Sequence, residues 1–221
     1  MRPARRAALC LTGLGLLTLD VRHHGRLARA DERILLSVAR LPHPTALVRA
    51  ALIVTGIGDA RVARLLGPAL AALAAADPVP AAAAAARATA DIAAGAAARK
   101  VACAVIARSR PPARYWLAHP VGHSFPSRHI TYAALALGAG TRGYPPRARQ
   151  AAAVLCGAVG FSRVYLGVHW STDVAAGWLL AGSWLAATEV LGGPVPAFER
   201  RPGSQFRPAT RASSATRAMS M

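Results

Sequence analysis

The chain has 221 residues, of which 54% are hydrophobic and only 5% aromatic, and its 27 Lys and Arg against 9 Asp and Glu give a formal net charge of +18. This length suffices for one sizeable domain, and the mean hydropathy of +0.32 is above that of an ordinary soluble domain. No recognisable nucleic-acid module accompanies the positive charge and aromatic residues are scarce, so we expect no nucleic-acid partner. The arginines instead suit the flanks of membrane helices, where they face anionic lipid.

The N-terminal region combines a basic start, MRPARR, with a short apolar run at 7–19. A signal peptide can begin in this way, but the bulky, charged sequence LTLDVRHHGR that follows makes a poor cleavage site. We therefore interpret the run as a first, short membrane helix. Residues 20–43 are polar, and we expect their amphipathic stretch DERILLSVARL to lie on the surface.

Further apolar segments follow along the chain, at 45–76, 78–107, 130–140, 151–161 and 174–191. The first has Gly56, Gly58 and Asp59 in its middle, so it is either one broken span or a surface piece followed by a span. A helix needs about 20 residues to cross the hydrocarbon core, so the shorter segments must extend into their polar flanks. The sequence thus predicts an all-α, polytopic membrane bundle of about six transmembrane helices, with the number within 45–107 left open. A soluble Ala-rich bundle is the alternative.

The basic loops predict an orientation. If the N-terminus is cytoplasmic, the Arg-rich segments at 141–150 and 199–221 are cytoplasmic too, although the Arg-containing residues 20–43 would then lie outside. We expect one membrane-embedded domain at 1–198 and a basic, disordered cytoplasmic tail at 199–221. In this topology the ends of the third and fifth helices and the starts of the fourth and sixth meet on the extracytoplasmic side.

Arg163, His169 and Asp173 interrupt the apolar stretch FSRVYLGVHWSTD at 161–173. His169 and Asp173 share a face if a helix begins near this point. A carboxylate on one imidazole nitrogen fixes the tautomer and frees the other nitrogen to act as a base or a nucleophile. For this pair alone, a helix cap or structural hydrogen bond is the alternative. A break at Gly167 would let Arg163 and His169 point into one cleft, and ionisable groups at membrane depth usually mark function.

A second polar group, HSFPSRHI at 123–130, reads as a helix start with Ser127 as N-cap. The N-terminus of a helix attracts anions, to which Ser127 adds a hydroxyl and Arg128 a guanidinium. His129 is a second imidazole, and two His on separate helices suggest a nucleophile and a proton donor. A capped helix with polar surface residues is the alternative.

A third group, KVACAVIARSRPP at 100–112, brings Arg108, Arg110 and Lys100 to the end of the third helix. The planar guanidinium of Arg binds oxyanions bidentately, although for Arg108 simple snorkelling at a helix end is equally expected. Guanidinium donors, a helix N-terminus, two imidazoles and one carboxylate together fit a phosphoryl group and a phospho-histidine intermediate. No acidic cluster offers a site for Mg²⁺ or Zn²⁺, so we expect no metal or other cofactor, with positive donors stabilising the transition state.

These residues make the sequence resemble the type 2 phosphatidic acid phosphatases, the membrane branch of the superfamily that includes vanadium haloperoxidases. The family's third motif, Ser-Arg, five residues, His, three residues, Asp, is complete at 162–173. Its second, Pro-Ser-Gly-His, occurs at 126–129 with Arg128 in place of Gly. Its first, Lys, six residues, Arg-Pro, occurs at 103–111 with Cys103 in place of Lys.

The resemblance, which runs from about residue 60 to residue 192, implies a role for each matching residue. His169 would be the nucleophile and Asp173 would orient it, while His129 would protonate the leaving oxygen and then activate water. The groups implied to hold phosphate oxygens are Arg110, Arg163 and Ser127. For the two departures, we hypothesise that Lys100, one turn before Cys103, reaches the phosphate, and that Arg128 replaces the missing charge.

The sequence therefore predicts a metal-independent phosphatase, multi-pass in the cell membrane, that hydrolyses a lipid phosphomonoester or diphosphate on the extracytoplasmic face. Phosphatidate, phosphatidylglycerol phosphate and polyprenyl phosphates or diphosphates all fit as substrates, and membrane lipids surround the protein. The sequence chooses neither among these lipids nor between oligomeric states. A catalytically weak or inactive relative that binds or translocates lipid phosphates is the alternative, and the membrane helices argue against vanadate-based peroxidase chemistry.

Overall fold

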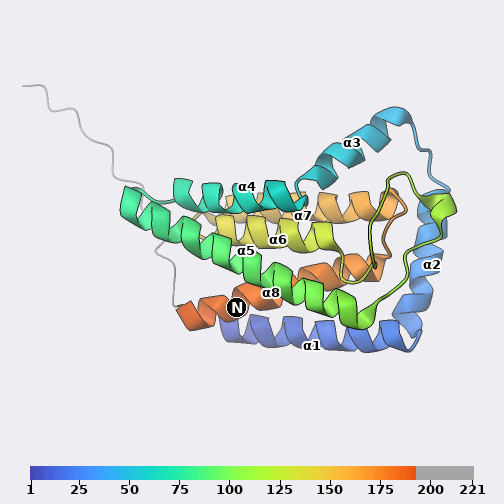
Figure 1. Ribbon diagram of the computed structural model, residues 1–221, viewed down its shortest axis with the longest axis horizontal. Coiled ribbons are helices and arrows are strands. Elements are labelled where there is room, and N and C mark those ends of the chain that lie inside the picture. The colour runs from blue at the N-terminus through green and yellow to red at the C-terminus, as the bar shows by residue number, and fades with distance from the viewer. Residues whose placement is uncertain (193–221) are drawn as a thin grey trace, which may run out of the picture.

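In the computed structural model of the protein, residues 1–192 are described, and the expected tail at 199–221 lies outside them. Within residues 1–192 the chain forms eight α-helices and one 3-10 turn, with no strand, so the all-α prediction is confirmed (Figure 1). The helices are α1 (Pro3–Arg22), α2 (Arg26–Ala39), α3 (Thr45–Gly56), α4 (Ala60–Leu73), α5 (Pro78–Ile106), α6 (Arg128–Gly140), α7 (Pro146–Tyr165) and α8 (Ser171–Gly192), with the 3-10 turn at Ala113–Tyr115.

Helix α6 is the centre of the bundle and packs against α4, α5, α7 and α8. Nine of its 13 residues are buried, which is typical of a helix that is apolar on all sides. Small residues let its neighbours approach closely: a Cβ on Gly67 would lie 3.1 Å from the Cα of Ala136, and one on Gly140 would lie 2.8 Å from the carbonyl oxygen of Gly67. These contacts fix α6 within the bundle, and its first turn carries His129.

The segment at 45–76 is broken, as its Gly and Asp residues indicated. Helix α3 tilts away from the bundle, although its C-terminal end packs against α7, and α4 runs along the bundle (Figure 1). Asp59 begins α4 as its N-cap, and its Oδ1 accepts a hydrogen bond of 2.8 Å from the backbone N–H of Arg61. The second predicted span is thus an outlying helix followed by a bundle helix.

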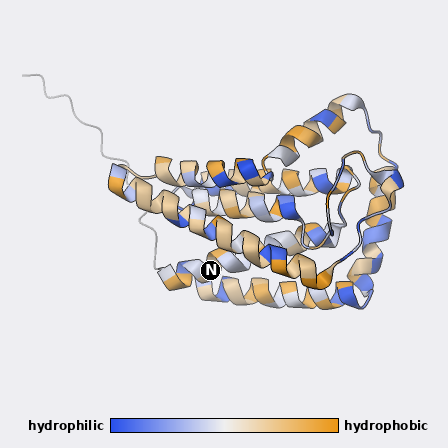
Figure 2. Cartoon of the chain, in the orientation of Figure 1, coloured by the Kyte–Doolittle hydropathy of each residue, from blue (hydrophilic) through white to orange (hydrophobic). Residues whose placement is uncertain are grey.

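Hydrophobic residues are frequent along the outer helices, including α1 (Figure 2), and several of their side chains are exposed. Leu9, Leu11, Leu16 and Leu19 of α1 are each more than half exposed. An exposed apolar surface of this kind points to contact with lipid rather than water. Among residues 1–192, one helix, α8, has the length and composition to cross a membrane, so the figure of about six spans stays a prediction.

The amphipathic stretch DERILLSVARL lies in α2, which crosses the end of the bundle and contacts α1, α7 and α8 (Figure 1). Its outward residues are exposed, as a surface helix requires. Its inner face is not on the surface, however, because Asp31 and Leu35 are 1% and 5% exposed. A buried carboxylate needs partners, and those of Asp31 lie in the site described next.

Candidate active site

The ends of α5 and α7 and the starts of α6 and α8 meet at one end of the bundle, as predicted (Figure 1). The connection at 107–127 is fastened there by backbone hydrogen bonds: the N–H of Leu117 donates to the carbonyl of Leu166, and the N–H of Ser127 to that of Asp173, at 2.9 and 3.0 Å. The three motifs, which are distant in sequence, therefore share one site.

The predicted break at Gly167 is confirmed, because α7 ends at Tyr165 and α8 begins at Ser171. Gly167 has a φ of +69°, and a Cβ there would lie 2.0 Å from the carbonyl oxygen of Tyr115. Glycine is the residue that accepts both this backbone conformation and this contact. The turn places His169 two residues before α8, in the loop rather than on the helix.

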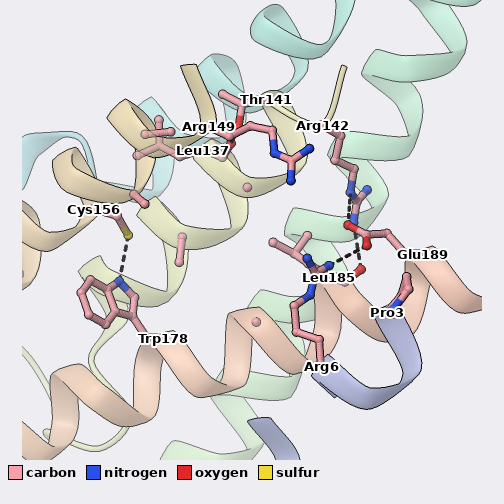
Figure 3. A pocket seen from close by; sticks show the side chains of 15 residues that line it. Pro3, Arg6, Leu137, Thr141, Arg142, Arg149, Cys156, Trp178, Leu185 and Glu189 are labelled. Atoms are coloured by element: carbon pink, nitrogen blue, oxygen red, sulfur yellow. Dashed lines mark hydrogen bonds and ion pairs between the residues drawn. The ribbon is translucent and has the colours of Figure 1, made fainter. Parts of the chain in front are cut away.

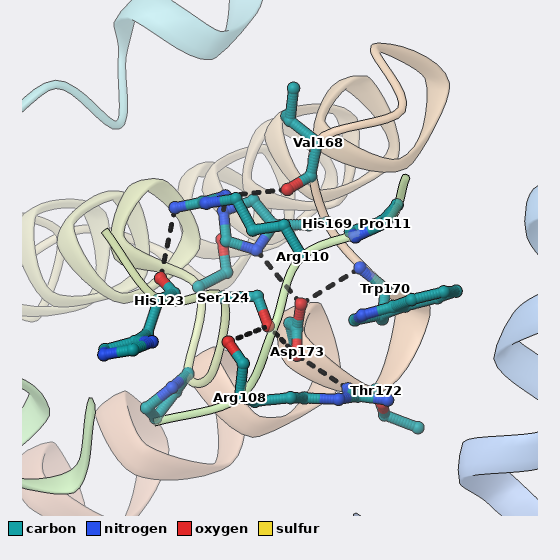
Figure 4. Close-up of polar contacts among 12 residues, drawn as sticks. Arg108, Arg110, Pro111, His123, Ser124, Val168, His169, Trp170, Thr172 and Asp173 are labelled. Atoms are coloured by element: carbon teal, nitrogen blue, oxygen red, sulfur yellow. Dashed lines mark hydrogen bonds and ion pairs between the residues drawn. The ribbon is translucent and has the colours of Figure 1, made fainter. Parts of the chain in front are cut away.

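His169 and Asp173 form a buried pair, and their exposures are 1% and 0% (Figure 4). His169 Nδ1 lies 3.2 Å from Asp173 Oδ2, which also accepts the backbone N–H of Trp170 at 3.0 Å. Because a carboxylate only accepts, the imidazole proton belongs on Nδ1 and the lone pair on Nε2. Burial lowers the pKa of His169 to about 4, although the hydrogen bond to Asp173 opposes that shift.

Arg110 lies at the reactive side of this imidazole, with its Nη1 3.1 Å from His169 Nε2 (Figure 4). Its guanidinium also donates to the backbone carbonyls of Gly122, Val168 and His123, at 2.8, 2.7 and 3.1 Å. These carbonyls fix the guanidinium before any ligand arrives. Preorganised charge of this kind costs no reorganisation during a reaction.

Among residues 1–192, two buried donors at the site have no hydrogen-bond partner. Ser127 is fully buried at the N-cap position of α6, yet its Oγ makes no capping hydrogen bond, in contrast to the expected role. Arg163 is 4% exposed; its Nη1 donates to Thr55 Oγ1 at 3.0 Å, but its Nε is unsatisfied. Buried polar groups in proteins are nearly always hydrogen-bonded, so such donors call for an explanation. An anion bound between them would supply the acceptor.

The second imidazole, His129, is half-buried on the first turn of α6 and lies within electrostatic range of Arg163 and His169. The turn between α3 and α4 presses against its backbone: a Cβ on Gly58 would lie 2.3 Å from the His129 carbonyl oxygen. Arg128, beside it, is exposed but also within range of Arg163. The structure therefore gathers both imidazoles and the predicted phosphate-binding residues, with Lys100 as the exception.

Lys100 is exposed on α5, whereas its neighbour Arg99 reaches the start of α6 through a hydrogen bond to Pro126. Arg99 is half-buried, donates from Nε to the carbonyl of Pro126 at 2.9 Å, and is within electrostatic range of Asp173. The spacing alone admits both Arg99 and Lys100, because residues three and four apart both share a helix face. Arg99 lies four residues before Cys103, the position of the family's Lys, and the structure shows that it, and not Lys100, is the one turned toward the site.

Arg108 and Asp31 form the outer part of the site. Arg108 donates from Nη1 to Asp173 Oδ1 at 2.7 Å and from Nη2 to Asp31 Oδ2 at 2.8 Å. Arg108 is thus more than a snorkelling helix-end charge. Asp31 was missed because an Asp in an amphipathic stretch looks like part of a solvated face.

With this geometry established, comparison with known proteins identifies the family. Residues 82–191 match the PAP2 superfamily. The chain belongs to the PAP2 superfamily. The resemblance seen in the three motifs is therefore confirmed.

A solved PAP2 structure shares the fold. This is the transmembrane PAP2-type phosphatidylglycerolphosphate phosphatase from Bacillus subtilis, with a TM-score of 0.70 and 22% identity, over 85% of this chain and 96% of that one. A shorter match is to an undecaprenyl-diphosphatase of Sulfolobus acidocaldarius, 62% identical over 32 residues. That match spans 14% of this chain and 15% of the relative's length.

The positions of Arg99 and Lys100 in this PAP2 chain make a matched test. We expect Arg99→Ala to weaken binding of inorganic phosphate about 10- to 100-fold, because one charge-assisted hydrogen bond contributes about 1.5–3 kcal/mol. Lys100→Ala, which removes an exposed charge one residue away, should change it little. Phosphate-dependent thermal shifts of the purified variants measure both affinities. A loss with Lys100→Ala alone would restore the hypothesis drawn from the sequence and refute the assignment to Arg99.

Proposed function

We propose that this membrane protein is a lipid phosphate phosphatase that acts through a phospho-histidine intermediate. The observation that carries the proposal is the buried pair of His169 and Asp173, with Nε2 free of the carboxylate and Arg110 beside it. An imidazole oriented in this way, in a site lined by guanidinium groups, suits attack on phosphorus. Family membership and the names of the two relatives support the same reaction class.

In the proposed mechanism His169 Nε2 gives its lone pair to phosphorus, and the bond from phosphorus to the leaving oxygen breaks. His129 donates a proton to that oxygen, so the lipid product leaves neutral at this position. His129 then takes a proton from water while the water oxygen attacks phosphorus. The bond from phosphorus to Nε2 breaks, and inorganic phosphate and the original imidazole are restored.

The charge of the transition state is spread over the phosphoryl oxygens, and the proposed site meets it with fixed donors. Arg110 is held by backbone carbonyls, and Ser127 and Arg163 each keep an unsatisfied donor. Arg99 adds a fourth positive or polar group. Such donors stabilise developing charge strongly because they are oriented before the reaction begins.

The substrate class is a lipid that carries a phosphomonoester or a terminal diphosphate. The two relatives are named for a phosphatidylglycerol phosphate and an undecaprenyl diphosphate, and both ligands present the same terminal phosphoryl group. We further propose a multi-pass arrangement in the cell membrane with the site on the extracytoplasmic face. The Arg-rich connection at 141–150 lies at the other end of α6 from His129, which fits a cytoplasmic position for that connection.

Phosphate release from a panel of phosphatidate, phosphatidylglycerol phosphate and a polyprenyl diphosphate tests the proposed function. His169→Ala should lose at least about 10³-fold in kcat, since no other group replaces the nucleophile. His119→Ala, an exposed loop histidine, is the matched control and should retain activity. Wild-type protein that binds these lipids but hydrolyses none of them would favour the non-catalytic alternative.

The two imidazoles have separable roles. We expect His129→Ala to lose far more activity on a lipid phosphate than on p-nitrophenyl phosphate, because a nitrophenolate departs without a proton. Acid-quenched wild-type protein should carry phosphate on His169, detected by mass spectrometry. Equal losses of His129→Ala on both substrates would contradict the assignment of His129 as proton donor.

The low pKa of His169 predicts an unusual acid limb. Because only neutral His169 has the lone pair, kcat/KM should stay level as pH falls through 6.5 and then drop about tenfold per unit below about pH 4. The measurement is made on His129→Ala with p-nitrophenyl phosphate, so that His129 does not titrate. An acid limb near pH 6.5 in that variant would show that His169 is not desolvated.

A further inference from the structure

The strongest observation outside the family motifs is a chain of hydrogen-bonded charges that leads from α2 to His169. Asp31 Oδ2 accepts from Arg108 at 2.8 Å, Arg108 donates to Asp173 Oδ1 at 2.7 Å, and Asp173 Oδ2 lies 3.2 Å from His169 Nδ1. Asp31 is 1% exposed, Asp173 is 0% exposed and the side chain of Arg108 is 14% exposed, so water screens this chain only weakly. Asp31 lies well before residues 82–191, the part that matches the family.

Asp31 also fastens the start of α8. Its Oδ1 accepts the hydroxyl of Ser171 at 2.5 Å and the backbone N–H of Thr172 at 3.0 Å, and its Oδ2 accepts the hydroxyl of Thr172. One carboxylate from α2 thus caps the helix that carries Asp173 and also balances the guanidinium that binds Asp173. The guanidinium of Arg108 is held in place as well, since it lies over the ring of Trp170.

We propose that Asp31 and Arg108 are positioning residues for the proposed nucleophile, and that α2 is therefore a working part of the active site. Arg108 holds the Asp173 carboxylate in the orientation that receives Nδ1–H. Asp31 neutralises Arg108, so that Asp173 keeps enough negative charge to orient and activate the imidazole. This inference rests on the proposed function of His169.

The two residues act on the basicity of His169 in opposite senses. His169 faces Asp173 from α8, Arg110 from the α5–α6 connection, Arg163 from α7 and His129 from α6, and these groups are unchanged in the variants. Removing the cation at Arg108 leaves Asp173 more negative in effect and raises the basicity of the pair. Removing the anion at Asp31 leaves the positive charge of Arg108 without its counter-ion and lowers the basicity of the His169–Asp173 pair.

The test compares Asp31→Asn and Arg108→Gln by the pH dependence of kcat/KM and by kcat and KM separately. Both variants should lose about 10- to 100-fold in kcat with KM nearly unchanged, because the nucleophile is misoriented while the phosphate donors remain. The acid limb should move up by about one unit for Arg108→Gln and down for Asp31→Asn. Glu32→Gln makes the same charge change at an exposed neighbour on α2, and it should neither lower kcat nor move the acid limb.

Asp31→Asn keeps the shape and one acceptor oxygen, so the cap of α8 has a substitute, and circular dichroism checks that the fold is retained. Equal losses with no movement of the acid limb, or movement in the same direction, would show a merely structural role and overturn the proposal. Failure of the underlying function is distinguishable, because wild-type protein would then release no phosphate at all.

A separate observation concerns a cavity of about 700 Å³ at the opposite end of the bundle (Figure 3). Helices α7 and α8 both pack on α6 but make little contact with each other, which leaves a space that α1 closes at one end. This volume lies in the range of ordinary ligand pockets. Its inner wall includes Leu137, Cys156 and Trp178.

The outer wall is basic. Arg6, Arg142 and Arg149 point toward the same space, against one carboxylate in the lining, Glu189 (Figure 3). Arg6 and Arg142 pair with Glu189 at 2.6 and 3.5 Å, and Arg142 also pairs with Asp91. Arg149 is exposed and makes no ion pair or hydrogen bond from its side chain within residues 1–192. The cavity thus has an apolar depth and a free guanidinium at its mouth.

We infer that this cavity binds a membrane phospholipid with an anionic headgroup, whose acyl chain lies between α7 and α8. Arg149 would receive the headgroup phosphate, and the positive excess of the lining would select anionic over zwitterionic lipid. The site is distinct from the catalytic one, and a phosphodiester lipid is no phosphomonoester substrate.

Native mass spectrometry of delipidated His169→Ala protein, titrated with phosphatidylglycerol or phosphatidylcholine, tests this site without turnover. Phosphatidylglycerol should bind about tenfold more tightly, and Arg149→Gln should reduce that preference, because it lowers the positive excess of the lining by one charge. Arg147→Gln, an exposed Arg of the same helix outside the cavity lining, is the matched control. Equal binding of both lipids, or equal effects of the two Arg variants, would overturn the inference.

Discussion

The buried carboxylate of Asp173 is the constraint on which the rest of the site depends. An ionised carboxylate with no exposure to water is costly unless charged and hydrogen-bonding partners surround it. Asp173 takes these partners from separate parts of the chain: Arg108 from the α5–α6 connection, and His169 with the backbone N–H of Trp170 from the turn before α8. Removing any one of them would leave a buried charge partly unpaired. The need to satisfy one carboxylate therefore holds the helix ends together, and through Arg108 it extends to Asp31 on α2.

Two of the groups assigned to bind the phosphate, unlike Asp173, have side-chain donors that lack hydrogen-bond partners. Within the part of the chain that the structure describes, Ser127 Oγ and Arg163 Nε are buried without hydrogen-bond partners, and each unsatisfied donor costs about 1–3 kcal/mol of stability. The packing of α6 and the turn at Gly167 hold these donors in place despite the loss of stability. A site in which the orienting carboxylate is fully satisfied and the proposed ligand donors are not is arranged for an arriving anion. The contrast between these two kinds of buried polar group is the physical argument for phosphate binding, independent of the family.

Apolar segments predicted most of the helices, and Gly167 predicted the turn, because both signals are local. The convergence of the three motifs followed from counting helices and alternating their directions. Predicting the roles of Arg99 and Asp31 would have required information that local sequence patterns do not contain. Choosing Arg99 over Lys100 requires the rotation of α5 about its axis, where one residue corresponds to about 100°. Placing Asp31 requires knowing that α2 folds across the end of the bundle, which no local pattern in 20–43 specifies.

The departures from the family pattern are easier to understand together than separately. Cys103 removes a cation from one helix face, and Arg99 returns one to the same face a turn earlier, with a longer side chain that spans the added distance. Arg128 adds a second cation where the pattern has Gly, and it fits because its side chain is exposed instead of packed against the backbone of α6. The loss of the cation at Cys103 is thus made good by Arg99, and Arg128 raises the positive charge near the proposed phosphate by one. What distinguishes this chain from the pattern is the source of its cations, and that source determines which side chains a lipid headgroup meets first.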